Sequence, residues 1–162
     1  TKKIYGDYIL LDSDEDFIGS INNNFQYSPF YEEEFFILNN KKQSLVKLKT
    51  IFSDKIDNFY DLNRSNDIPI NKNDIIIGNS LSERMNISIG DSISIYDTNI
   101  SINSLTVMKD QQFFVKDIYQ NRILRSDEFL VFSVFDEENL PNKLSGIELL
   151  GKIGRASCRE RV

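Results

Sequence analysis

Apolar residues alternate with polar ones over short stretches of the N-terminal half, and this period of two predicts strands. Residues 4–11 predict a first strand, and the acidic stretch Asp12-Ser13-Asp14 that follows is typical of a helix start. Residues 32–38 and 44–52 predict two strands around a turn at Asn39-Asn40-Lys41. The second of these strands is expected to be half buried, since Leu45, Lys47 and Lys49 alternate roughly with Val46, Leu48 and Ile51.

The clearest local pattern lies in the middle of the chain, after a stretch at residues 53–66 that predicts a helical turn and a loop. Residues 75–77 are three consecutive isoleucines and predict a buried strand that ends at Gly78. Ser80 and Glu83 have the spacing of a capping box, so a short helix is expected there. Asn86 is expected to end that helix.

The C-terminal half predicts further short strands. A Gly90-Asp91 turn precedes the first of them, Asp136 is expected to cap a helical turn, and Pro141 is expected to stop that turn. The order of these elements favours antiparallel pairing. The strands are predicted at residues 92–96, 112–119, 129–135 and 147–150. The patterns together predict an α+β fold that is β-rich, with mixed or antiparallel sheets and a few short helices.

Composition narrows the function. The 162 residues are 40% hydrophobic, which predicts a folded domain with a core, and the net charge of −6 argues against nucleic acid as a partner. The sequence holds no histidine, so histidine bases and Ser-His-Asp triads are excluded. An enzyme would have to use carboxylates, Lys or Tyr. No apolar run approaches the ~20 residues that a membrane-spanning helix needs.

The two ends of the sequence are interpreted as artificial. The chain opens on Thr1 without a leader, so its start is expected to be a cut. Residues 153–162 resemble the translation of a sequencing adapter, and residues 1–152 are expected to be the domain fragment. The tail holds three Arg and one Glu, or +2, so the remainder carries −6 − (+2) = −8 and no cysteine. The alternative is a genuine basic tail.

Residues 75–91, read as strand, Gly78, short helix, Gly90-Asp91 and strand, resemble a signature of the periplasmic core domain in ABC-transporter permeases of the MacB, FtsX and Lol group. The order of the later segments supports this resemblance, which covers residues 74–150. Residues 113–119, 127–132, 134–140 and 144–149 are similar, in turn, to the family's next strand, its acidic-then-apolar strand, its short helix and its last strand.

The resemblance implies a two-lobed extracytoplasmic domain, inserted between the first two transmembrane helices of an inner-membrane permease of the lipoprotein-releasing type. It implies no catalysis, no cofactor and no metal. The implied partners are an ABC ATPase subunit, a partner permease, and a lipoprotein cargo or a soluble periplasmic carrier. In one branch of the family a protruding hairpin docks the carrier, and residues 96–111 occupy its place without the Pro and Gly seen there. The candidate partner-contact residues are Tyr96, Asn99, Ile102, Leu105 and Met108.

Other groups of residues have a structural and a functional interpretation. The run Glu32-Glu33-Glu34 has the chemistry of a cation site, but neighbours on a strand face opposite sides, so a solvated strand edge is favoured. Asp12 and Asp14 are candidate acid and base groups of a glycosidase, although nothing in their spacing selects them. Six phenylalanines are expected in the core, with an acyl-chain groove as the alternative: Phe35, Phe36, Phe113, Phe114, Phe129 and Phe132.

Two other functions remain open from the sequence. One is a free-standing soluble β-rich binding module with a double-psi-like core. The other is a carboxylate-based hydrolase, which would need two acidic residues with shifted pKa values in a deep pocket. Apolar runs of about 20 residues in the coding region on either side would distinguish the permease from the free-standing module.

Overall fold

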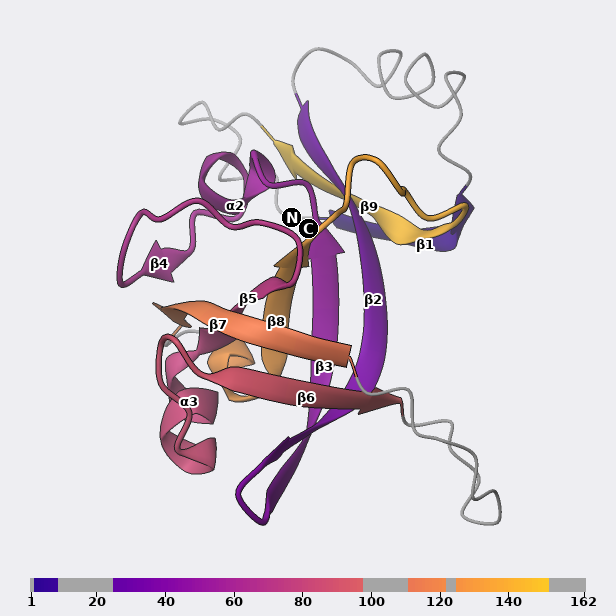
Figure 1. The fold of residues 1–162 in the computed structure, drawn as a ribbon. Helices are drawn as coiled ribbons and strands as arrows, with labels where there is room; N and C mark the ends of the chain where they lie inside the picture. Colours follow the sequence, from indigo (N-terminus) through magenta and orange to yellow (C-terminus); the bar gives the residue numbers. More distant parts are fainter. Residues whose placement is uncertain (1, 9–24, 98–110, 122–124, 152–162) are drawn as a thin grey trace, which may run out of the picture.

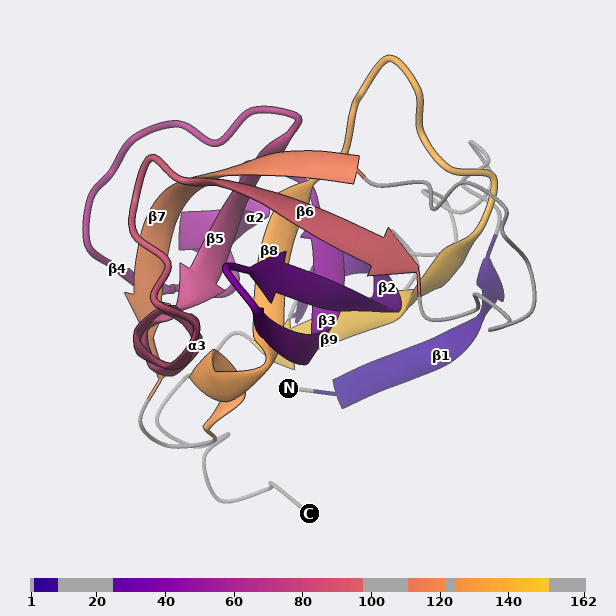
Figure 2. The same ribbon diagram turned by 60° about the horizontal axis from the view of Figure 1, so that its bottom comes forward.

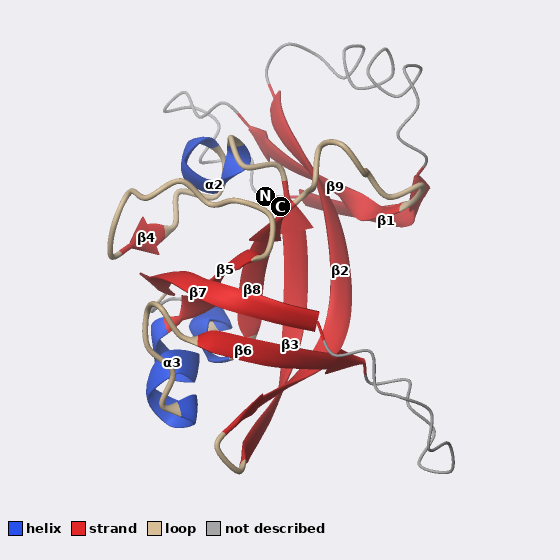
Figure 3. Ribbon diagram, in the orientation of Figure 1, coloured by secondary structure: helices blue, strands red, loops and turns tan. Residues whose placement is uncertain are grey.

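The structure is a computed structural model, and it describes residues 2–8, 25–97, 111–121 and 125–151 (Figure 1). In this part of the chain most residues lie in strands, and helices are few and short (Figure 3). The β-rich α+β fold class is therefore confirmed. The elements are β1 (Lys2–Tyr8), β2 (Phe25–Asn39), β3 (Lys42–Ile51), α2 (Lys55–Asn58), β4 (Asn63–Arg64), β5 (Asp74–Gly78), α3 (Asn79–Met85), β6 (Ser92–Asp97), β7 (Gln111–Gln120), the 3-10 turn η1 (Ser126–Glu128), β8 (Leu130–Val134) and β9 (Leu144–Gly151).

Six of the strands close into a ring. Neighbours follow the order β2, β3, β8, β5 and β7, and β6 closes the ring because it pairs with both β7 and β2 (Figure 2). The β3–β8 and β5–β7 pairs are parallel, and the other four pairs of the ring are antiparallel. The sheet is therefore mixed, which is one of the two predicted forms, and the antiparallel pairing expected in the middle of the chain is correct for β6–β7 and wrong for β5–β7.

The interior of the ring is the first of two apolar cores. Its residues come from alternate positions of the strands, because successive side chains of a strand point to opposite faces. Each fully buried aliphatic side chain stabilises the fold by roughly 1.5–3 kcal/mol. Helix α3 closes one end of the ring with Leu81 and Met85. The buried strand residues of this core are Ile37, Val46, Leu48, Ile75, Ile77, Ile93, Ile95, Phe113, Val115 and Val131.

The N-cap of helix α3 differs from the prediction, which placed it at Ser80. Its N-cap is Gly78, and within the described residues no side chain caps it, so the capping box of Ser80 and Glu83 is wrong. The Ser80 hydroxyl instead donates to Asp127 Oδ2 at 2.8 Å. A Cβ on Gly78 would lie 2.0 Å from the Asp127 carbonyl oxygen, so only glycine lets η1 approach this closely. Asn86 ends the helix in the left-handed conformation (φ 54°), as predicted.

A second core lies on the outer face of the ring. Phe30, Ile51 and Phe132 point outward from β2, β3 and β8, and Ile56 of α2 and Ile70 of the following loop cover them. Residues 53–66 therefore hold the helical turn and the loop that the sequence predicts, and their apolar side chains seal the outside of the sheet. This second core explains why β3 is buried on both faces.

Strands β1 and β9 form an antiparallel ribbon beside the ring. Lys2 lies opposite Leu149 and Ile4 opposite Ile147, so the start of β1 lies beside the end of β9. The first half of β2 pairs with β9 and the second half with β3 and β6, which makes β2 common to the ribbon and the ring. All described strands thus belong to one nine-stranded sheet, and a division into two lobes is not confirmed.

Three further predictions concern Asp136, the segment after Asp12 and the C-terminal tail. Asp136 caps a single turn, as predicted: its carbonyl accepts from the Asn139 N–H at 3.0 Å, and its Oδ1 accepts from the Glu138 N–H. The helix expected after Asp12, and the tail at 153–162, lie outside the described residues. No helix within them is long and apolar enough to cross a membrane.

Candidate functional site

A buried cluster of charges lies where the ribbon joins the ring. Lys49, on the outward face of β3, contacts the Glu148 carboxylate of β9, and its Nζ is 3.7 Å from Glu32 Oε1 of β2. The side chains of these residues are 2%, 4% and 10% exposed. The hairpin strands β2 and β3 therefore meet β9, which is distant in the sequence, in one ionic group away from water.

Two aromatic rings complete the surroundings of the ammonium group. Lys49 Nζ lies 4.6 Å from the ring centre of Phe30 and 4.8 Å from that of Tyr60, which are distances typical of cation–π contacts. The Tyr60 hydroxyl is buried and has no hydrogen-bond partner among the described residues. Burial, and then the negative charge of Glu148, raise the pKa of Tyr60.

The position of Glu32 corrects one prediction. Glu33 and Glu34 are exposed, as expected for a solvated run, but Glu32 is not, because it faces the buried Lys49. Its backbone is also held, since the Glu32 N–H donates to Ser145 Oγ at 2.8 Å. A grouping of three or more acidic, His or Cys side chains that suits a metal ion is not found in the part of the chain that the structure describes.

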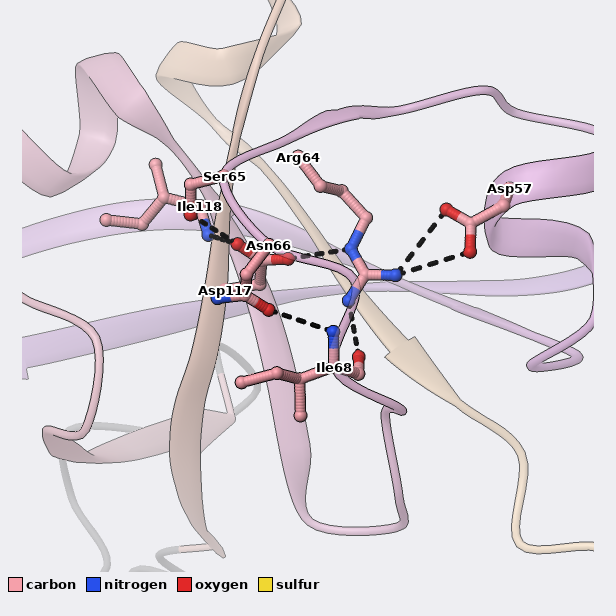
Figure 4. Close-up of polar contacts among 7 residues, drawn as sticks. All are labelled: Asp57, Arg64, Ser65, Asn66, Ile68, Asp117 and Ile118. Atoms are coloured by element: carbon pink, nitrogen blue, oxygen red, sulfur yellow. Dashed lines mark hydrogen bonds and ion pairs between the residues drawn. The ribbon is translucent and has the colours of Figure 1, made fainter.

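A second buried carboxylate, Asp117 of β7, holds the loop after β4 (Figure 4). Arg64 Nε donates to Asp117 Oδ2 at 2.7 Å, and the Ser65 hydroxyl donates to Oδ1 at 2.6 Å. Arg64 also reaches the Ile68 carbonyl at 2.5 Å and the Asp57 carboxylate at 3.4 Å. The Asp117 side chain is fully buried and both of its oxygens accept hydrogen bonds, so it anchors the loop.

An open cleft of about 430 Å³ lies at the end of the ring opposite α3. Its floor is apolar and is built by side chains that belong to the ring or directly follow it, namely Phe35, Leu48, Phe113, Val134 and Phe135. Its size falls in the range of about 300–1,000 Å³ that is usual for ligand sites, and the mouths of barrels are a common place for them.

The rim of the cleft is charged and mainly acidic. Tyr31 donates to Glu33 Oε1 at 2.5 Å, and this bond, together with burial, raises the pKa of Tyr31 to about 12. Lys72 Nζ lies 3.6 Å from Asp136 Oδ2. The amide of Asn139, which donates to the same carboxylate, lowers the pKa of Asp136. One lysine against two carboxylates leaves the rim with one net negative charge.

Of the candidate partner-contact residues, the structure describes only Tyr96. It lies near the end of β6, and its neighbours across the sheet are Phe36 and, one strand further, Leu45. Leu45 is 48% exposed, and Leu38 on the same face is 40% exposed, so Tyr96 belongs to an apolar row on the outside of the ring. Asn99, Ile102, Leu105 and Met108 lie outside the described residues, and the contact segment stays a prediction.

The six phenylalanines divide between core and surface. Phe113 and Phe132 are buried and Phe35 packs against the inner core, as predicted. Phe114 and Phe129 are 53% and 46% exposed, so the core interpretation is wrong for them. Phe36 is half-buried in the row beside Tyr96.

Sequence reasoning missed both buried ionic groups. The alternation of β3 assigns Lys47 and Lys49 to one face, and nothing local shows that β9 and Tyr60 cover one of them and leave the other exposed. Lys49 and Glu148 are 99 positions apart, and Arg64 and Asp117 are 53 apart. Only the tertiary fold brings these partners together.

Comparison with solved structures identifies the fold. The chain superposes on the extracellular domain of the noncanonic ABC-type transporter YknZ from Gram-positive bacteria with a TM-score of 0.60, at 10% identity, over 94% of this chain and 77% of that chain. It superposes on the periplasmic region of MacB from Actinobacillus actinomycetemcomitans with a TM-score of 0.58, at 8% identity, over 94% of this chain and 71% of that chain. No protein-family model matches the sequence, and no curated protein matches it either. The resemblance to MacB-type domains is thus confirmed for the fold.

Proposed function

We propose that this chain, which has the fold of the MacB and YknZ extracytoplasmic domains, is a non-catalytic domain of an ABC-transporter permease at the outer face of a bacterial inner membrane. In this role it transmits motion driven by ATP hydrolysis in a separate subunit. The proposed cargo is a lipoprotein or another amphiphile, which the domain handles or passes to a soluble carrier. A partner permease and an ATPase subunit complete the proposed assembly.

The β1–β9 ribbon is the observation that carries the proposal. Because Lys2 pairs opposite Leu149, the chain enters and leaves the folded body at one place. A domain inserted between two neighbouring membrane helices needs this arrangement, since both of its connections must return to the same surface. The ribbon is also the part that such helices would move first.

The cluster around Lys49 supports a role in transmission. It joins β9 of the ribbon to β3 of the ring across β2, through a contact that water does not weaken. A displacement of the ribbon would therefore carry the ring with it rather than bend the junction. Neither ionic group places a reactive side chain on the surface, in keeping with a mechanical role.

The proposal is tested first by the gene and then by transport. We expect the coding region to specify apolar runs of about 20 residues on both sides of this domain, and runs absent from both sides would overturn the proposal. In the full-length permease with its ATPase, the double variant Lys49→Met/Glu148→Leu is expected to keep the fold but slow ATP-driven release of a lipoprotein. Lys41→Met, at the exposed tip of the β2–β3 hairpin, is the control that should release at the normal rate.

The closed ring itself favours one alternative. Six strands with two parallel pairs form a barrel-like body, which suits a free-standing binding module with a double-psi-like core. Such a module would bind its ligand without membrane anchors or an ATPase. The same reading of the flanking coding region distinguishes the two functions.

A further inference from the structure

Inward-facing positions of the ring change from apolar to polar toward the open cleft. Along β2, Phe35 is followed on the same face by Glu33 and then Tyr31, and along β3 Leu48 is followed by Thr50. The apolar filling of the ring therefore stops before the end of the ring at which the cleft lies. What remains is a hollow with an apolar floor and polar walls.

The walls of the cleft offer hydrogen bonds in both directions. Thr50 Oγ1 and Ser133 Oγ share one hydrogen bond at 2.8 Å, so the hydroxyl that accepts it keeps its own hydrogen for another acceptor. The side chains of Asn73 and Gln111 at the rim are exposed and carry both donors and acceptors. Donors and acceptors side by side suit the N–H and C=O groups of a peptide backbone.

The charges on the rim of the cleft determine which charge a ligand should carry. Asp136 is matched by Lys72, whereas Glu33 receives only a neutral phenol from Tyr31 among the charged and phenolic groups of the rim. The rim therefore favours a cation near Glu33 and disfavours an anion. Glu33 is exposed, so its contribution is modest and depends on salt.

We propose that this cleft binds an extended peptide segment of another protein, in which a large apolar residue and a lysine or arginine stand two positions apart. The spacing follows from β2, where Phe35 of the floor and Glu33 of the rim are themselves two positions apart. In an extended peptide, residues two apart point to the same side, about 6.6 Å from each other, and adjacent residues do not. The apolar side chain occupies the floor and the basic one meets Glu33.

A hydrocarbon chain fits this cleft less well than a peptide. It would cover the hydroxyls of Thr50 and Ser133 and the rim amides without offering them a hydrogen bond, and each polar group left unpaired costs about 1–3 kcal/mol. The carboxylate of a fatty acid would also meet the acidic rim. The polar walls therefore favour the peptide over an acyl chain.

The proposal is tested with the chain as it stands and with short labelled peptides. The probes are fluorescein-labelled, C-terminally amidated Ser-Phe-Ser-Lys-Ser and its reversed order, Ser-Lys-Ser-Phe-Ser, with binding measured by fluorescence anisotropy. We expect at least one of them to bind at least threefold more tightly than Ser-Phe-Lys-Ser-Ser, in which the two side chains are adjacent. Replacing Lys by Glu in the probe should weaken binding severalfold, because the attraction to Glu33 becomes a repulsion. In nuclear magnetic resonance spectra the backbone signals of Thr50 and Ser133 should shift on binding.

Glu33 and Glu34 provide a matched pair of variants. Both are exposed residues of β2, but they point to opposite faces. Glu33→Gln is expected to weaken the better probe about two- to fivefold and to remove most of its salt dependence, as for a partly exposed ion pair. Glu34→Gln should leave binding unchanged.

Three results would each overturn the proposal: no saturable binding of either spaced probe, equal binding of the adjacent-residue probe, or an equal loss in both Glu variants. Displacement of the bound probe by laurate at submicellar concentration, with Thr50 and Ser133 shifting alike, would assign the cleft to an acyl chain instead. The experiment involves neither membrane nor ATPase. It can therefore fail while the permease proposal stands, and the reverse.

Discussion

Lys47 and Lys49 stand two positions apart on the same face of β3, yet their side chains are 40% and 2% exposed. The alternation in the sequence assigns both lysines to the same face of β3. It does not show which other parts of the chain cover that face. Glu148 and the ring of Tyr60 cover Lys49, and both lie outside β3, Glu148 in the distant strand β9. At this scale the fold decides whether a charge is a surface group or part of the interior.

The ion pair between Lys49 and Glu148 should matter more when one partner is removed than when both are. Lys49→Met leaves Glu148 buried without its cation, and we expect the free energy of unfolding to fall by about 3–5 kcal/mol. Lys49→Met/Glu148→Leu should recover most of that loss, because the charge of Glu148 is removed with its cation and Glu32 keeps its contact with Lys47 at 3.9 Å. Urea denaturation measures both, with Lys41→Met at the exposed hairpin tip as the control. If Lys49→Met changed the free energy of unfolding by less than about 1 kcal/mol, the assignment of a buried ion pair would be contradicted.

The buried tyrosines predict a loss of stability in alkali. The pKa of Tyr31 is raised to about 12 and that of Tyr60 is raised by burial, against an ordinary value of 10.0. Below pH 10 both phenols are protonated in the folded and the unfolded chain, so stability does not change with their titration. Above pH 10 only the unfolded chain releases these protons, and the free energy of unfolding falls as pH rises toward the folded pKa.

Tyr60→Phe isolates this effect, since it removes the phenol hydroxyl and keeps the ring that packs against Lys49. We expect the variant to lose less stability than the parent between pH 9 and pH 11, in urea unfolding curves taken on both sides of the ordinary tyrosine pKa of 10.0. At pH 7 it should be as stable as the parent or more so, because the hydroxyl that is removed has no partner in the described part of the chain. A steeper alkaline loss in the variant would refute the explanation.

Whole elements were far more predictable than single contacts. The hairpin of β2 and β3, the strand–helix unit of β5 and α3, and the strands β6 to β9 lie where local periodicity puts them, because burial of one face imposes period two. The first half of β2, which pairs with β9, was not predicted, since β2 begins at Phe25 and not at Glu32. The helix start at Ser80 was wrong, since Asp127 competes for the hydroxyl. The cleft and both ionic groups were missed, because each is assembled by residues from several strands.

The loop after β4 is the element whose order depends most on a single side chain. Asp117→Asn would weaken the bonds from Arg64 and Ser65, and we expect residues 61–70 to open locally without global unfolding. Hydrogen exchange should show faster exchange of the Ser65 N–H, which now donates to the Ile118 carbonyl at 3.0 Å. The Ile87 N–H, bonded to the Ser82 carbonyl near α3, should keep its protection. Equal acceleration at both positions would mean that Asp117 supports the whole fold.

At the scale of the whole molecule, pairing partners were the least predictable feature. Leu48 of β3 lies beside Val131 of β8, and Ile75 of β5 beside Val115 of β7, in parallel pairs that no short-range pattern specifies. The closure of the ring by β6 decides these neighbours. The comparison with the YknZ and MacB domains shows the same architecture at 10% and 8% identity, so very different sequences satisfy this closure.

The meeting of β1 and β9 predicts that the chain tolerates new ends. Opposed residues of antiparallel strands lie about 4.5–5.5 Å apart, so a linker of a few residues can join residue 151 to residue 2. New ends between Asn40 and Lys41, at the exposed hairpin tip, should leave a permuted chain folded. We expect the far-ultraviolet circular dichroism spectrum to match the parent and urea unfolding to remain cooperative. A permuted chain that does not fold would show that the ribbon depends on the original connection.

The position of β1 also has a consequence for biosynthesis. Its partner among the described strands is β9, so β1 is synthesised well before the strand with which it pairs. At about 5–20 residues per second, the ~140 residues between them take roughly 7–30 s to synthesise. During that time the unpaired backbone of β1 is open to chaperones, or to a second nascent chain.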